Sequence, residues 1–210
     1  MIEITNQFVH GFEAAIRGMR NPLESWTKSD SKFNVNNGIG VWIGAEDKTL
    51  MMKLVKAGTD HSKFMRMICV TVDINAPLYW WKEFDTYRMG VEKNSCSTMH
   101  TLHKRDLTLN DFSIERTCER YLPTVERLIA DINDARRMYL ETGDTDFWES
   151  MVQMLPSSFM QKRTVCMSYQ AIRNMYHARK HHKLKEWREF CAWAWQLPVS
   201  ELITEGFSDD

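Results

Sequence analysis

The segment Phe64 to Pro77 constrains the fold more than any other part of the chain. From Phe64 to Ile74, apolar and polar side chains alternate and β-branched residues are frequent, which is typical of a strand buried on one face. Pro77 lacks the backbone N–H that a strand ladder needs, so we expect the strand to end near it. A helix can begin directly after a proline, and apolar residues predict a helix there. These residues are Leu78, Tyr79, Trp80, Trp81 and Phe84.

Apolar residues at helical spacing predict further helices, one before this strand and four after it. In the first of them, Leu50, Met51, Leu54 and Val55 share one face, and Gly58 stands where a helix would end. The predicted helices cover 46–57, 121–139, 145–154, 169–181 and 185–195. Short strands are expected over 40–44 and 164–169, and we expect 88–120 to be polar and irregular.

Length and charge narrow the classes of protein to be considered. With 210 residues and 43% hydrophobic content, the chain is long enough for one domain, 1–210, with a substantial core. Its 27 basic and 28 acidic residues nearly cancel, so we expect neither nucleic acid nor an anionic membrane as partner. The longest apolar stretches fall short of the roughly 20 residues that span a bilayer, and no secretory signal is recognisable, which predicts a cytoplasmic protein.

Five cysteines are widely spaced and form no C-x-x-C pair, so we expect free thiols rather than disulfides or a zinc site. Paired histidines at helical spacing, His177 and His181, could hold a metal, but no third ligand is suitably spaced, so no metal is predicted.

Several stretches, taken in order, resemble the flavin-dependent thymidylate synthase family. "KTLMMKLVKAGTDHSKFMRMICVTVDINAPLYW" is similar to a family helix, its H-x-[ST]-x-F-E-H turn, and the strand that ends in Ala-Pro. "MLPSSF" resembles the L-P before a late strand, and "YQAIRNMYHARKHHKLKEWREF" resembles the two C-terminal helices. "GFEAAIRGM" resembles the opening G-F-V strand. The resemblance implies an α+β fold, with a small, mostly antiparallel sheet packed with helices in a single domain.

The family signature, R-H-R followed by a serine, is degenerate in this chain. Without gaps, R-H-R falls on Thr86, Tyr87 and Arg88, and the serine falls on Cys96; one inserted residue would instead match Ser97. Tyr87 can stack and form one hydrogen bond but cannot shuttle protons near neutral pH as histidine does. Arg88, always charged and planar, can still pair with a phosphate or lie over a flavin ring.

The resemblance also implies roles for other residues. Ser62 matches the serine or threonine of the turn, and Glu83 stands where the family has glutamine. Gln170 replaces the arginine of R-S-L, which grips the nucleotide phosphate. The implied cofactor-binding residues are Ser62, Tyr87, Arg88, His177 and Arg179. The implied substrate-binding residues are Glu83, Ser97, Gln170 and Arg188.

The catalytic residues remain open, with Arg88, Ser97 and Cys96 as candidates. Cys96 as a thiolate could attack a pyrimidine ring, but an inert thiol is the alternative. Arg88 could equally be a surface arginine paired with Asp85 or Glu92, and Arg179 part of a basic helix end.

Two functions from different classes therefore stand side by side. In one, the chain is a homotetrameric enzyme that binds FAD, with NADPH and methylenetetrahydrofolate as co-substrates, and converts a deoxyuridine nucleotide, by default dUMP to dTMP. In the other, the same fold has lost its chemistry and serves as a nucleotide-binding or assembly protein. An unrelated α/β protein with a chance likeness is a third possibility.

Overall fold

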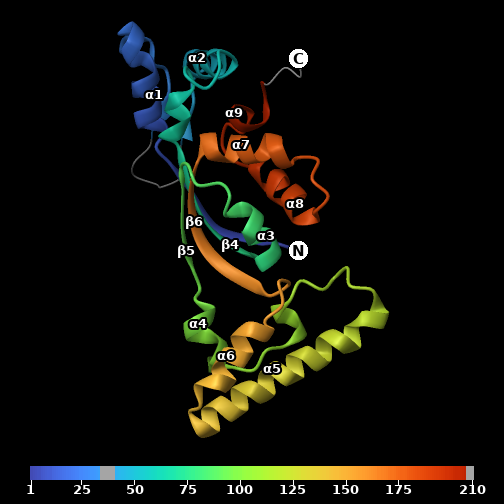
Figure 1. The fold of residues 1–210 in the computed structure, drawn as a ribbon. Helices are drawn as coiled ribbons and strands as arrows, with labels where there is room; N and C mark the ends of the chain where they lie inside the picture. Colours follow the sequence, from blue (N-terminus) through green and yellow to red (C-terminus); the bar gives the residue numbers. More distant parts are fainter. Residues whose placement is uncertain (34–40, 207–210) are drawn as a thin grey trace. The chain divides into compact units, whose positions relative to one another are not determined.

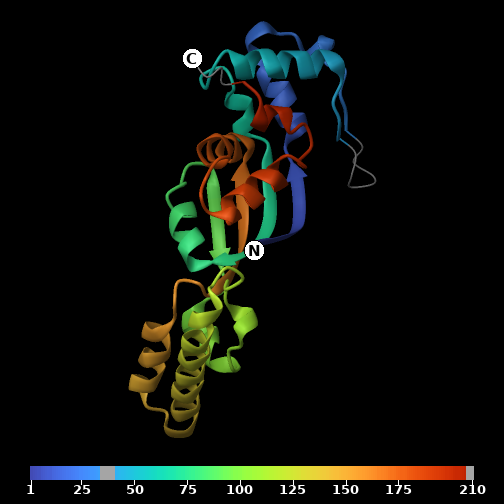
Figure 2. The same cartoon turned by 90° about the vertical axis from the view of Figure 1, so that its right-hand side faces the viewer.

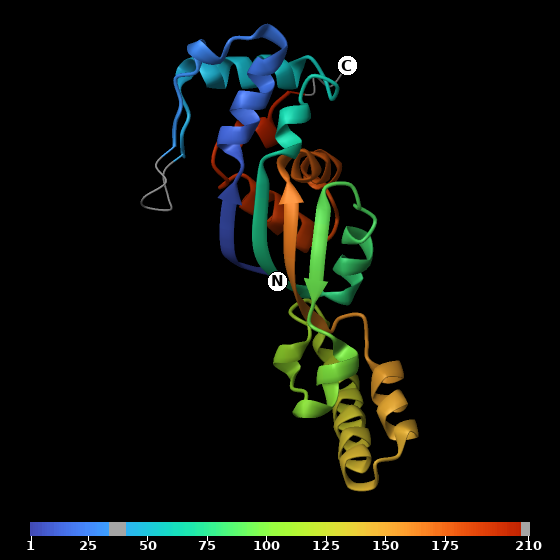
Figure 3. The ribbon, with the colours of Figure 1, turned by 90° about the vertical axis from the view of Figure 1, so that its left-hand side faces the viewer.

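The computed structural model describes residues 1–33 and 41–206. One sheet of four strands has the order β1-β4-β6-β5, and β5 and β6 run in opposite directions (Figure 3). A second sheet pairs two short antiparallel strands. The strands are β1 (Glu3–His10), β2 (Lys32–Phe33), β3 (Val41–Trp42), β4 (Cys69–Pro77), β5 (Val91–Ser95) and β6 (Met160–Ser168). A small antiparallel sheet with helices confirms the α+β class.

The chain forms two compact units (Figure 1). Unit 1 comprises Met1–Glu3, Ile74–Thr86 and Asn94–Thr164, and unit 2 comprises Ile4–Asp73, Tyr87–Lys93 and Val165–Asp210. The helices of unit 1 are α3 (Leu78–Phe84), α4 (Thr98–Thr101), α5 (Leu122–Thr142) and α6 (Thr145–Met154). Those of unit 2 are α1 (Phe12–Arg20), α2 (Ala45–Lys56), α7 (Tyr169–Arg179), α8 (Lys185–Ala194) and α9 (Glu201–Thr204).

The junction of β4 and α3 lies where the sequence predicts it, at Pro77. The helix begins directly after the proline, and its first two N–H groups donate to carbonyls of the loop before β6. Leu78 N lies 3.0 Å from Phe159 O, and Tyr79 N lies 2.9 Å from Ser157 O. A helix leaves its first N–H groups without partners inside the helix. Here the first two of these groups are paired with carbonyls of the loop before β6.

Three aromatic side chains of α3 are completely buried: Trp80, Trp81 and Phe84. The indole N–H of Trp81 donates to Gln161 O at 2.8 Å, and the Arg163 guanidinium lies 4.3 Å from the centre of its ring. Arg163 also forms an ion pair of 2.9 Å with Asp85 at the end of α3. This helix is therefore fixed to β6 by packing, by a hydrogen bond and by a cation–π contact.

The long helix α5 packs against α6 in unit 1 (Figure 2). Apolar residues of α5 at helical spacing face a cluster formed with α6 and the loops before α5. The buried members are Leu102, Leu107, Phe112, Ile129, Ile132, Ala135 and Met151. Gly143 ends α5 with φ +72°, a left-handed conformation that favours glycine, which confirms the predicted stop.

We expect Ile132→Ala to lower the free energy of unfolding by about 2–5 kcal/mol, because it removes a buried side chain and leaves a cavity. Ile132 is 1% exposed, whereas Leu140 on the same helix is 55% exposed. Leu140→Ala is the matched control and should change stability by no more than about 0.5 kcal/mol. Urea unfolding measures both, and equal effects would contradict the packing described for α5.

In unit 2, a buried ion pair joins α1 to α2. The guanidinium of Arg20 lies 2.7 Å from the carboxylate of Asp47, and both side chains are buried. Asp47 also accepts hydrogen bonds from Ser29 and Ser31 and from the backbone N–H of Asp30. The loop after α1 is thereby held to the first turn of α2, where a carboxylate is also favoured by the helix dipole.

Asp47→Asn should destabilise the protein by roughly 3–5 kcal/mol, because the buried guanidinium of Arg20 loses its counter-charge. Burial alone would raise the pKa of Asp47, but hydrogen bonds from Ser31, Ser29 and Arg20 outweigh it and lower the pKa to about 2. A carboxyl whose pKa is lowered by folding stabilises above its unfolded pKa, so this contribution should fade as the pH falls from about 4 toward 2. Chemical denaturation at neutral and acid pH tests this; an unchanged acid dependence in Asp47→Asn would contradict it.

Several sequence expectations for strands need correction. Residues Lys63–Arg66 form a 3-10 helix, and the strand begins only at Cys69. Phe64 and Met65 are both buried, although consecutive residues of a strand point to opposite faces. The predicted strand 164–169 is longer and starts at Met160. For the predicted strand at 40–44, Gly40 lies outside the described residues, and Val41–Trp42 is a strand.

Three strands were missed, and one of them, β2, has only two residues. β5 lies in the segment expected to be irregular, and only Val91 of its five residues is buried, so it carries no apolar alternation. β1 was missed as well, because the opening strand was placed on "GFEAAIRGM". That segment is α1, where Phe12, Ala15, Ile16 and Met19 are buried at helical spacing.

All five cysteines are free thiols, as predicted. Among the described residues, no helix is both long enough and apolar enough to cross a membrane.

Candidate functional site

The loop between α3 and β5 carries Tyr87 and Arg88, and in unit 2 it is held against the start of α7. The backbone N–H of Ser168 donates to Gly90 O at 2.9 Å. Gly90 has φ +70°, and a β-carbon there would lie 2.6 Å from the Ser168 hydroxyl, so only glycine fits. Ser168 also caps α7 by accepting from Ala171 N at 3.2 Å. The position of this loop is thus set by the helix that carries Arg179.

Tyr87 and Arg179 meet, although they are far apart in the sequence. Nε of Arg179 donates to the Tyr87 hydroxyl at 2.9 Å, and the guanidinium lies 5.7 Å from the centre of the Tyr87 ring. It also lies 4.9 Å from the centre of the Trp187 ring, which belongs to α8 and is completely buried. Tyr87 and Trp187 contact each other edge to face at 5.9 Å. The result is a planar cation held against two aromatic rings that also contact each other, hereafter the Arg179 cluster.

Arg88 is exposed and forms no hydrogen bond or ion pair with any described residue. The alternative in which Asp85 neutralises it does not hold, because Asp85 pairs with Arg163. A guanidinium in this state keeps all its donors for a ligand.

Ser62 and Gln170 form a second contact in unit 2. Both are buried, and the Ser62 hydroxyl donates to Gln170 Oε1 at 3.3 Å. Gln170 Nε2 donates in turn to Asn174 Oδ1 at 3.0 Å, one helical turn further along α7. Gln170, which stands where the family has its phosphate-binding arginine, therefore uses its amide for hydrogen bonds within unit 2.

The two remaining residues predicted for the C-terminal helices differ in their surroundings. Arg188 is exposed, and its Nη1 donates to the carbonyls of His182 at 2.7 Å and Lys183 at 2.9 Å. It thereby stabilises the turn between α7 and α8 while its other guanidinium nitrogens remain accessible. His177 is half-buried on α7, and its ring contacts that of Tyr176.

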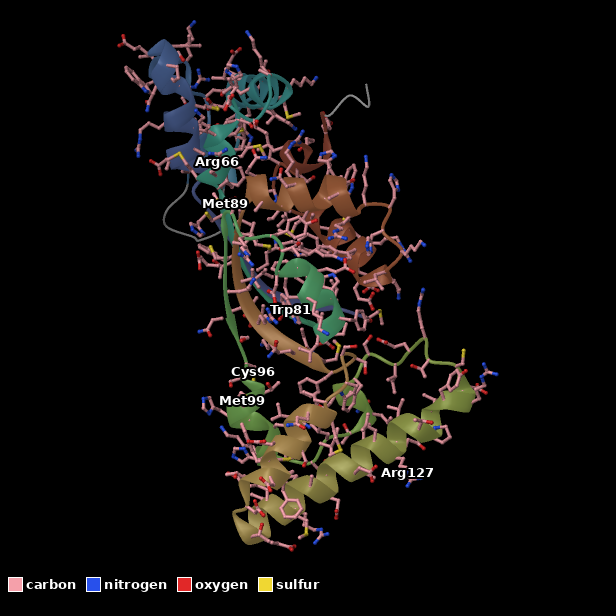
Figure 4. All side chains as sticks on the ribbon, in the orientation of Figure 1. Arg66, Trp81, Met89, Cys96, Met99 and Arg127 are labelled. Atoms are coloured by element: carbon pink, nitrogen blue, oxygen red, sulfur yellow. The ribbon has the colours of Figure 1, made fainter. Side chains whose placement is uncertain are left out.

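Three predicted residues belong to unit 1. Glu83 is half-buried on α3, and its carbonyl accepts from Thr86 N and Oγ1. Ser97 is the residue before α4, and its carbonyl accepts from Thr101 Oγ1 at 2.6 Å. Cys96 is exposed (Figure 4) and borders a hollow of about 440 Å³ lined also by Asn94, Ser95, Lys162 and Thr164.

Two participants in these contacts were not predicted from the sequence. The Trp187 ring contacts the guanidinium of Arg179, and Asn174 accepts the hydrogen bond that Gln170 donates, at the end of the chain of bonds from Ser62. The tryptophan stands in "EWR", where the family has E-I-R, so an aromatic residue beside a matched arginine was the available signal. Nothing in the local sequence marks Asn174.

The elements around these contacts define a class: an α+β protein in which an antiparallel sheet carries C-terminal helices that present arginines. Comparisons with known proteins make this more specific. No family model matches the chain, and no curated protein matches it.

The structure is similar to crystal structures of flavin-dependent thymidylate synthase (ThyX) from Helicobacter pylori in complex with FAD and dUMP. One is 15% identical, with a TM-score of 0.68, over 97% of this chain and 100% of that chain. Another is 16% identical, with a TM-score of 0.69, over 96% of each chain. At these identities the likeness shows the fold, which confirms the resemblance inferred from the sequence.

We expect Tyr87→Phe to lower the free energy of unfolding by about 1 kcal/mol, because the hydroxyl that accepts from Arg179 is lost while the ring remains. Tyr79→Phe is a matched control in unit 1, because it removes a hydroxyl that shares a 3.2 Å hydrogen bond with the neutral hydroxyl of Ser113. Combining Tyr87→Phe with Arg179→Met in a double-mutant cycle isolates the pair, and additive effects would show that the two side chains do not interact.

Proposed function

We propose that this chain is a divergent enzyme of the flavin-dependent thymidylate synthase type, acting on a deoxyuridine nucleotide and by default converting dUMP to dTMP. The observation that carries the proposal is structural likeness over 97% of the chain to an enzyme crystallised with FAD and dUMP. Fold alone does not assign function, so the residues must also suit the ligands.

The cations of unit 2 suit FAD and a nucleotide phosphate. Arg88 offers an unengaged guanidinium, which binds phosphate oxygens with two parallel hydrogen bonds. Arg179 presents a flat cation already oriented by Tyr87 and Trp187, so little conformational entropy is lost when an anion or a ring lies against it. Bound and reduced, FAD would supply the hydride.

The chain's own residues then bind and orient. In this proposal Arg88 and Arg179 hold the cofactor, Arg188 contributes its accessible nitrogens to the substrate phosphate, and Ser62 and Gln170 support α7 from inside. Tyr87 cannot replace a histidine in proton transfer near neutral pH, so its part is to orient Arg179. NADPH and methylenetetrahydrofolate are the proposed co-substrates. The proposed assembly is a homotetramer of single-domain chains, 1–210, with sites built from several copies.

A second candidate is a nucleotide-binding or assembly protein that has lost catalysis. The observation that favours it is the Ser62–Gln170–Asn174 chain of hydrogen bonds, in which neutral side chains stand where the family has a charged phosphate ligand. Turnover separates the two candidates. Formation of dTMP from dUMP, with NADPH and methylenetetrahydrofolate, supports the enzyme; FAD or dUMP binding without turnover supports the alternative.

We expect the purified protein to bind FAD, and Arg88→Ala to weaken FAD or dUMP binding roughly 10- to 100-fold, the cost of losing a charged hydrogen bond. Arg88→Lys, which keeps the charge but not the planar fork, should fall between. Arg127→Ala is the control, because Arg127 is exposed on α5 (Figure 4) and belongs to unit 1. Flavin absorbance and calorimetric titration measure binding, and equal affinity in wild type and Arg88→Ala would remove Arg88 from the site.

A further inference from the structure

A hollow of about 230 Å³ lies beside α1 in unit 2. Part of its wall is one face of α1, where Glu13, Ile16, Arg17 and Arg20 recur at the spacing of three and four residues that brings helical side chains together. None of these residues belongs to the Arg179 cluster or to the proposed binding of FAD and nucleotide. The hollow therefore calls for a ligand of its own.

The rest of the described wall is aromatic and belongs to the chain that follows α1. Trp26 and Phe33 line the hollow together with Ser29. The indole N–H of Trp26 donates to Asn21 Oδ1 at 2.8 Å, which fixes the direction of its ring. Ile16, which is 2% exposed, adds an apolar surface. Aromatic rings attract other flat rings in stacked or edge-to-face arrangements, so this wall suits a ligand that carries a ring.

Arg20 holds the loop with Trp26 against α1. Its Nη1 donates to Ser25 O at 3.3 Å, and its Nη2 donates to Lys28 O at 3.2 Å, so the loop is bound on both sides of Trp26. The positive charge of Arg20 is balanced by Asp47. The shape of the hollow is thus set by the protein itself, which reduces the conformational entropy lost when a ligand binds.

Two opposite charges that line the hollow have no partner in the described part of the chain. Glu13 and Arg17 are exposed and one helical turn apart, yet neither forms a hydrogen bond or an ion pair with a described residue. A ligand with a negative charge alone would face the carboxylate of Glu13, and one with a positive charge alone would face the guanidinium of Arg17. A ligand with both charges on neighbouring atoms satisfies both side chains.

We propose that this hollow binds a free aromatic amino acid. The guanidinium of Arg17 donates two parallel hydrogen bonds to the α-carboxylate, and the carboxylate of Glu13 accepts from the α-ammonium. The aromatic side chain of the ligand lies against Trp26, Phe33 and Ile16. The size agrees, because pockets for drug-sized molecules measure roughly 300–1,000 Å³ and this hollow is smaller.

The pair of charges distinguishes a free amino acid from a peptide. Within a peptide, the amino and carboxyl groups of a residue are joined in peptide bonds, so neither carries a charge. An ammonium and a carboxylate on the carbon next to one ring occur together only in the free amino acid.

The test measures binding of L-phenylalanine to the full chain by equilibrium dialysis, without FAD or nucleotide. We expect one saturable site on each chain, and an affinity about 10-fold lower or weaker still in Arg17→Gln, Glu13→Gln and Trp26→Ala. Arg66→Gln and Trp195→Ala are the matched controls and should bind like wild type. Both of these residues are exposed in unit 2, and neither lines the hollow.

Two derivatives of the probe separate the charges. L-Phenylalaninamide lacks the carboxylate, so it should bind weakly and with the same affinity to wild type and Arg17→Gln. N-Acetyl-L-phenylalanine lacks the ammonium, so it should bind weakly to wild type and no more weakly to Glu13→Gln, which removes a repelling carboxylate.

Absence of saturable binding at millimolar L-phenylalanine would overturn the inference. Unchanged affinity in both Arg17→Gln and Glu13→Gln would do the same, as would N-acetyl-L-phenylalanine binding as tightly as the free amino acid, which would mark a site for anions. Circular dichroism checks the fold of each variant, and the two charge variants carry the test if Trp26→Ala does not fold. Since FAD and dUMP are left out, the outcome is independent of the proposed enzyme activity.

Discussion

Pro77 is the constraint on which the strand-to-helix junction of this protein depends. It ends the ladder of β4 and fixes the backbone angle from which α3 starts, so the three aromatic residues of α3 enter the core in one defined direction. Complete burial of side chains as large as Trp80, Trp81 and Phe84 stabilises by about 1.5–3 kcal/mol each or more. The first two N–H groups of the helix find carbonyl partners in the loop before β6, so the backbone donors of Leu78 and Tyr79 are paired.

In the candidate site, cation–π contacts and a hydrogen bond of an arginine set the geometry, whereas apolar packing sets it at the strand-to-helix junction. Arg179 is held against Tyr87 and Trp187, and the loop that carries Tyr87 is fixed by Gly90 against the cap of α7. An arginine constrained in this way is already oriented for an anion, whereas Arg88 next to Tyr87 remains exposed. One guanidinium is thus fixed by the protein's own aromatic rings, and the other is left for a ligand.

The chain shares its fold with ThyX but differs from the family signature in the charge of residues at matching positions. Where the resemblance implies an arginine, Gln170 forms neutral hydrogen bonds with Ser62 and Asn174 inside unit 2. Neutral hydrogen bonds of this kind stabilise α7 but offer no charge to a phosphate. The departures from the family signature therefore remove positive charge, and Arg88, Arg179 and Arg188 are retained arginines at matching positions.

The α+β class followed from the resemblance of several stretches to a known family. The sequence by itself determined the end of β4 at Pro77, α3, and the helices α2, α5, α6, α7 and α8. Each of these depends on signals within a few residues: apolar spacing, a proline, or a glycine at a helix end. β1 and β5 escaped prediction because their residues are mostly exposed. The strand predicted over 64–68 was wrong because Met65, Arg66 and Met67 alternate apolar and polar side chains as a strand does, although Lys63–Arg66 is a 3-10 helix. Only the tertiary structure decided that Arg179 meets Tyr87 and Trp187 and that Gln170 contacts Ser62, because contacts between residues distant in sequence depend on how the elements pack.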